Sequence, residues 1–114
     1  MVQSAQALMQ DVNSKTMQLT GNKFIAGMTD IPAAGTRVLL LPANQKTIAV
    51  WIRPKPANVG DIYVGTVTVD ATHGLIMAKT DPAVVIYVDN SQTPIYVDAA
   101  TNGDDVSYLA WYAE

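Results

Sequence analysis

The sequence contains no cysteine and only one histidine, His73, among its 114 residues. Without thiols the chain can form neither a disulfide framework nor a thiolate metal site, so burial or contacts between subunits must stabilise it. His73 lies beside a glycine in a turn-like stretch, and no nucleophile-elbow signature accompanies it. A glycine-rich phosphate loop is also missing. We therefore expect a protein that is not an enzyme and that binds no cofactor and no metal.

Long apolar runs and clusters of basic residues are missing as well. No run approaches the roughly 18 apolar residues of a membrane-spanning helix, and the N-terminus lacks the basic and apolar regions of a signal peptide. The seven Lys and Arg residues are scattered along the chain, unlike the basic patch of a nucleic-acid-binding protein. The sequence predicts a protein made in a cytoplasm, without a membrane or a nucleic acid as partner.

The acids and bases are unevenly distributed. Residues 1–79 hold all seven Lys and Arg and four acids, whereas residues 80–114 hold six acids and no base. Such an asymmetry can serve complementary faces that meet across a subunit contact. The alternative is that the acids, many of them at predicted strand ends, only build turns on a solvated surface.

Residues 1–16 differ from the rest and are expected to form an N-terminal arm. They are rich in Gln, Ser, Asn and Ala, and Ala5, Leu8, Met9 and Val12 follow the spacing of one helical stripe. A helix this short is marginal in water, so the stripe needs a surface to pack on. That surface is either the arm's own domain or a neighbouring subunit.

Residues 17–114 are predicted to form one domain with an all-β fold, a single jelly-roll-like β-sandwich. Apolar residues make up 49% of the chain and charged residues 15%, which suits one packed core. From residue 17 the hydrophobic period changes to 2, with turn residues roughly every ten positions. Strands are expected at 36–41, 47–53, 61–69, 83–88, 94–98 and 105–112, and one or a pair within 17–26.

Two details of the predicted sandwich can be checked directly. In the segment 61–69 the apolar parity switches at Gly65, which predicts a bulge there that keeps Ile62, Val64, Val67 and Val69 inward. The dipeptide Asn102-Gly103 predicts a tight turn between the last two strands. The core is expected to contain Ile48, Val50, Ile52, Ile62, Val64, Val84, Ile86, Val88, Ile95 and Val97.

Several aromatic residues lie on predicted strands at the parity opposite to the aliphatic core. Outward aromatic side chains are favoured at protein interfaces, because they bury large rigid areas at a low entropic cost. The same residue types also line sugar-binding modules, and cross-strand packing within one sheet would equally account for them. The residues that we expect at a capsid or subunit interface are Leu8, Met9, Val12, Trp51, Tyr63 and Tyr96.

The order of short motifs along the chain resembles that of small tailed-bacteriophage virion proteins of the capsid decoration, or cement, type. These motifs are Pro56-Ala57-Asn58-Val59-Gly60-Asp61-Ile62-Tyr63-Val64-Gly65, Gly74-Leu75, Val88-Asp89-Asn90, Ile95-Tyr96-Val97-Asp98 and Gly103-Asp104-Asp105-Val106-Ser107-Tyr108.

The resemblance implies a protein on the capsid exterior of the virion that binds the major capsid protein, often as a homo-oligomer such as a dimer or trimer. It implies no catalytic residues. Two alternatives stay open, because a fold does not fix a function. One is another virion component, such as a head fibre, neck or tail protein, and the other is a carbohydrate-binding or adhesin module.

Overall fold

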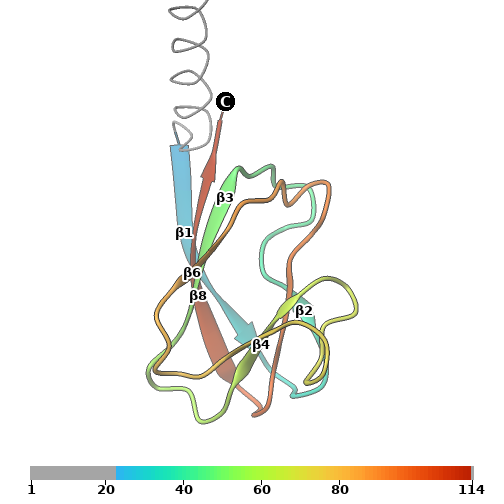
Figure 1. The fold of residues 1–114 in the computed structure, drawn as a ribbon, viewed down its shortest axis with the longest axis vertical. Helices are drawn as coiled ribbons and strands as arrows, with labels where there is room; N and C mark the ends of the chain where they lie inside the picture. Colours follow the sequence, from blue (N-terminus) through green and yellow to red (C-terminus); the bar gives the residue numbers. More distant parts are fainter. Residues whose placement is uncertain (1–22, 114) are drawn as a thin grey trace, which may run out of the picture.

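The computed structural model of the protein describes residues 23–113, which form eight β-strands in two layers (Figure 1). The strands are β1 (Lys23–Ile31), β2 (Val38–Leu39), β3 (Ala49–Pro54), β4 (Ile62–Gly65), β5 (Leu75–Met77), β6 (Val84–Ile86), β7 (Tyr96–Ala99) and β8 (Asp104–Tyr112). In this part of the chain no helix is long and apolar enough to cross a membrane.

The strands form two antiparallel sheets of four. The first sheet has the order β1-β8-β3-β6 and the second the order β2-β7-β4-β5. The pairs β1·β8, β2·β7, β3·β6 and β4·β5 nest within one another, as when one long hairpin is wound into two layers. This is the pairing of a jelly-roll-like sandwich. The prediction of an all-β sandwich is therefore confirmed.

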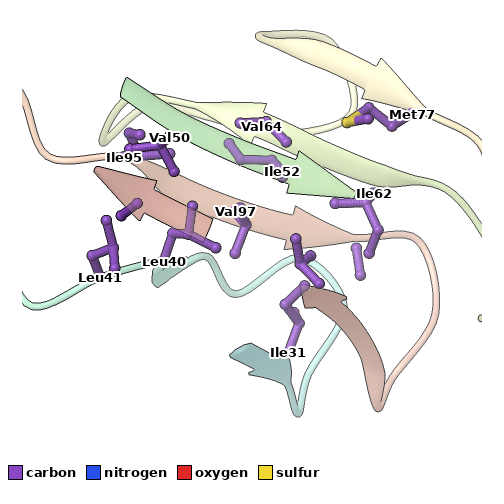
Figure 2. Close-up of a cluster of buried hydrophobic side chains, with 13 residues drawn as sticks. Ile31, Leu40, Leu41, Val50, Ile52, Ile62, Val64, Met77, Ile95 and Val97 are labelled. Carbon is purple, nitrogen blue, oxygen red and sulfur yellow. The ribbon is translucent and has the colours of Figure 1, made fainter. Parts of the chain in front are cut away.

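The core lies between the two sheets and is built from the alternate residues that face inward (Figure 2). Val50 and Ile52 of β3 face Ile62 and Val64 of β4 across this core, and all four are buried. The other predicted core residues divide by position in the sheet. Ile95 and Val97 are buried, whereas Ile48, Val84, Ile86 and Val88 are half-buried. The last three lie on or next to β6, which is an edge strand with a neighbour on one side only.

The prediction of a bulge at Gly65 is wrong. Gly65 pairs regularly with Tyr96 as the last residue of β4, and its φ angle is not positive. The chain then turns, closed by a 2.9 Å hydrogen bond from the Val69 amide to the Thr66 carbonyl oxygen. This turn returns Val69 to the core, where it is 2% exposed, and leaves Val67 at its tip, 52% exposed. The change of parity marked the end of a strand rather than a defect within it.

The turn at Asn102-Gly103 is present, with Gly103 at φ 82°. It does not close a hairpin, however, because β7 and β8 belong to different sheets. The only consecutive strands that pair in the described residues are β4 and β5. The predicted arm, with Leu8, Met9 and Val12, lies outside the described residues.

Candidate interaction surfaces

The outer face of the first sheet carries large apolar side chains. Phe24 of β1 lies opposite Trp111 of β8, and Leu109 of β8 lies opposite Trp51 of β3. These residues alternate with the inward-facing ones, so they point away from the core. Phe24 and Met28 are each 63% exposed and Trp51 is 43% exposed. We call this set, Phe24, Met28, Trp51, Leu109 and Trp111, the outer aromatic face.

The rings of the outer aromatic face contact one another. The ring centroids of Phe24 and Trp111 are 6.4 Å apart, and those of Trp51 and Trp111 are 5.8 Å apart at an interplanar angle of 85°. The Trp51–Trp111 contact is edge-to-face and the Phe24–Trp111 contact is tilted by 35°, and such ring contacts favour a defined orientation of the rings. The face therefore presents a pre-ordered apolar surface that spans β1, β8 and β3.

A shallow hollow adjoins Trp51 on this sheet. Its volume is about 370 Å³, and its lining is mostly apolar with Arg53 and Ser107 as the polar members. The remaining lining residues are Ala26, Gly27, Trp51, Ile52, Ala83, Tyr108 and Leu109. Such a hollow can receive one protruding side chain or one small ring of a partner.

The second sheet also turns aromatic residues outward, but these are half-buried. Tyr63 of β4 lies opposite Asp98 of β7 and Ile76 of β5, and Tyr96 lies opposite Gly65. Tyr63 and Tyr96 thus lie on neighbouring strands of one outer face. Trp51 belongs to the other sheet, so the structure does not bring the three predicted interface residues together.

Buried polar side chains at the loops account for much of the remaining chemistry. Asn90 is fully buried. Its side-chain nitrogen Nδ2 donates hydrogen bonds to the carbonyl oxygens of Pro42 at 2.9 Å and Gln45 at 3.3 Å. Its side-chain oxygen accepts a hydrogen bond from the Ile95 amide at 2.9 Å. One side chain thereby fixes the loop before β3 to the loop before β7.

A second buried cluster fixes the loop between β3 and β4 to the start of β8. The Asn58 side chain donates to the Asp105 carbonyl oxygen at 2.8 Å and accepts from the Asp105 amide at 2.9 Å, as a neighbouring strand would. The Asp104 carboxylate accepts hydrogen bonds from the amides of Val59 at 3.0 Å and Gly60 at 2.9 Å. Both side chains are buried. They act on backbone groups and leave no oxygen directed at a cleft.

Most of the described acids of the C-terminal part accept hydrogen bonds from backbone amides, in their own loop or in a distant one. Asp98 accepts from the amides of Gly35 and Ala99, and Asp81 accepts from the amide of Ala78. Asp89 bonds the hydroxyl and amide of Ser91, and the hydroxyl bond lowers the pKa of the Asp89 carboxyl most. Hydrogen bonds within the chain therefore account for the positions of these acids.

The ring Nδ1 of His73 lies 2.8 Å from a carboxylate oxygen of Asp70 across a tight turn, and both side chains are exposed. This contact, with hydrogen bonds from the amide and hydroxyl of Thr72, lowers the pKa of Asp70 to about 2. Among residues 23–113 no three metal-ligating side chains gather, and no buried side-chain polar atom there lacks a partner. The candidate functional surface of the described structure is therefore the outer aromatic face.

The alternation of residues along the sequence did not identify Phe24 and Met28 as part of the outer aromatic face. In β1, Phe24, Ala26 and Met28 face outward while Ile25 and Gly27 face inward, and both sets are apolar. Alternation of apolar and polar residues is the signal that separates the two sides of a strand, and β1 has none. Only the structure distinguishes its two sides.

Comparison with known proteins identifies no family for this chain. No protein-family model matches the chain, and no curated protein matches it. A solved structure from work on Bacillus endospore appendages, which form a novel family of disulfide-linked pili, matches with a TM-score of 0.45 and 15% sequence identity. The match covers 83% of this chain and 94% of that chain. Similarity at this level carries no argument about this chain.

Proposed function

We propose that this protein is a bacteriophage capsid decoration protein, a structural component that binds the outside of the major capsid protein lattice and reinforces the head. The observation that carries the proposal is the outer aromatic face. A soluble protein rarely leaves a contiguous set of large apolar side chains open unless a partner covers it. The motif order that resembles decoration proteins supplies the identity of that partner.

The described part of the chain is suited to such a role. Its buried polar side chains Asn58, Asn90 and Asp104 bond backbone atoms of the loops, which suits a rigid structural domain. The rings of Phe24, Trp51 and Trp111 are already ordered against one another. A surface that is ordered before binding loses little side-chain entropy when a partner covers it.

The proposal is tested by adding the purified protein to heads that lack it. We expect saturable binding and greater resistance of the heads to heat and chaotrope, because a ligand that binds only the assembled state stabilises it by mass action. Trp51→Ser should weaken this binding at least tenfold, whereas Ile76→Ser, on the outer face of the second sheet, should not. Heads that are equally fragile with and without the protein would contradict the cement role.

A carbohydrate-binding module is the second candidate, favoured by the hollow beside Trp51. An indole ring next to a polar rim of Arg53 and Ser107 is an arrangement that can stack on a sugar ring and bond its hydroxyls. A glycan array distinguishes the two functions. Selective glycan binding that Trp51→Ser abolishes, without binding to heads, would favour the module.

A further inference from the structure

β1 is the one long edge strand of the described structure. It contains nine residues, whereas the other edge strands β2, β5 and β6 contain two or three. β8 pairs with one side of β1 along its whole length. Within residues 23–113 no strand pairs with its other side, and β1 forms the margin of the first sheet in Figure 1. Alternate residues of β1 therefore direct backbone N–H and C=O groups outward.

Proteins usually protect such edges with proline, charge or a short strand. β1 has none of these protections between Phe24 and Thr29, because this stretch contains no proline and no charged residue. The other edge strands, β2, β5 and β6, are protected by being short. An unprotected edge of this length is a template for another strand.

The exposed side chains of β1 match a second copy of the same strand. Phe24 and Met28 lie at equal distances on either side of Ala26, on the same face, and each is 63% exposed. Antiparallel pairing about Ala26 places Phe24 of each copy opposite Met28 of the other. Opposed residues lie about 5 Å apart, and a thioether against an aromatic ring is a favourable contact. The pairing would cover the two most exposed apolar side chains of the strand.

Other registers are less suitable. A shift by one residue would place outward-facing residues opposite inward-facing ones, because the side-chain period of a strand is 2. Pairing about Gly27 keeps the faces aligned but sets Phe24 opposite Asp30 of the other copy, which places a carboxylate on a phenyl ring. Pairing about Ala26 also brings only two methyl groups together at the axis.

We propose that the protein forms a two-fold symmetric dimer in which β1 pairs antiparallel with β1 of a second copy, centred on Ala26. The two first sheets become one continuous sheet, and the two outer aromatic faces become one surface twice as wide. This inference rests on the edge and its residues, and does not rest on the capsid role. A monomer that still decorates heads would overturn the dimer and leave the proposed function standing.

The absence of cysteine allows a direct test with the full-length chain. Ala26→Cys places the thiols of the two copies opposite each other at the axis, within the Cα separation of about 4.4–6.8 Å that a disulfide bridges. Met28→Cys is the matched control on the same face of the same strand. In the proposed register its two copies lie about 14 Å apart, because four residues at about 3.4 Å each separate them.

Under mild oxidation we expect Ala26→Cys to form a covalent dimer at least tenfold faster than Met28→Cys. Sedimentation of the unmodified chain should show a monomer–dimer equilibrium, and Phe24→Lys should raise its dissociation constant at least tenfold. Adding Met28→Glu to Phe24→Lys should restore most of the affinity, since the pairing sets Lys opposite Glu. Circular dichroism checks that each variant keeps its fold.

Two results would overturn the proposal. Equal cross-linking at the two cysteine positions would mean that the copies do not meet in this register. A chain that stays monomeric at high concentration, with β1 amides protected from hydrogen exchange on both edges, would mean that another part of the same chain covers the strand.

Discussion

Two regions of this protein invert the usual distribution of polar and apolar groups. At the loops the chain buries polar side chains, Asn58, Asn90 and Asp104, and pairs each with backbone groups of a distant segment. On the outer aromatic face it exposes Phe24 and Trp51 to solvent. The first region stabilises the fold, since satisfied buried groups specify one arrangement of the loops. The second adds little to the fold and is free to serve a partner.

Removing the Asn90 side chain should have the largest effect on stability. Asn90→Ala leaves the carbonyl oxygens of Pro42 and Gln45 and the amide of Ile95 without their partner, at a cost of about 2–4 kcal/mol. Urea denaturation followed by tryptophan fluorescence measures this loss. Gln92→Ala, in the same loop but exposed, is the control and should change stability little. Equal effects of the two substitutions would contradict the role of Asn90.

Asp104→Asn should destabilise the protein by a smaller amount. The carboxylate accepts two amide hydrogens, from Val59 and Gly60, whereas a carboxamide offers one oxygen and turns its NH₂ group toward the other amide. We expect a loss of about 1–2 kcal/mol, measured by the same denaturation. The exposed acid Asp61 provides the control variant Asp61→Asn. A neutral result at Asp104 would show that the loop does not depend on the pair of bonds.

Trp51→Ser should reduce the stability of the protein only slightly but reduce its binding strongly. The side chain lies outside the core, and its loss removes one edge contact with Trp111, at about 1 kcal/mol or less. Under the proposed function, binding to heads should fall at least tenfold, because aromatic anchors dominate interface energies. A variant that unfolds as readily as Asn90→Ala would place Trp51 with the structural region instead.

The smallest expected effect is that of Asp70, on an exposed turn. Its pKa of about 2 in the folded state lies below its usual value of 3.8. The folded state therefore gains stability above pH 3.8, and loses it as the pH falls toward 2. Asp70→Asn should have a shallower fall in stability between pH 4 and 2 than the parent chain. Identical slopes in thermal melts over this range would show that the contact with His73 does not contribute.

The sequence predicted the positions of the strands better than it predicted which strands pair with each other. Period-2 alternation located β3 and β8 closely, because one face of each strand is buried. It failed after Gly65, where the parity of Val67 and Val69 reflected a turn. Local patterns also could not show that β7 and β8 lie in different sheets, since strand pairing depends on contacts between distant segments.

The interface residues show the same limit. Parity predicted that Trp51, Tyr63 and Tyr96 point away from the core, and they do. It did not show that Trp51 lies on one sheet and the two tyrosines on the other. The structural roles of Asn58 and Asn90 were also not predicted, because each bonds backbone atoms more than thirty-five residues away along the chain. Whether Leu8, Met9 and Val12 bind a neighbour remains a prediction.

The nested strand pairing also constrains how the chain can fold during synthesis. β8 lies between β1 and β3 in the first sheet, so the pairing partner of β1 is missing until residues 104–112 have left the ribosome, and before then β3 can pair only with β6. A nascent chain would meanwhile carry β1 with both of its edges open. Pairing between distant segments is intrinsically slow, and open strand edges in partly folded chains favour aggregation. We therefore expect refolding from denaturant to be slow for a chain of this size, and its yield to fall as the protein concentration rises.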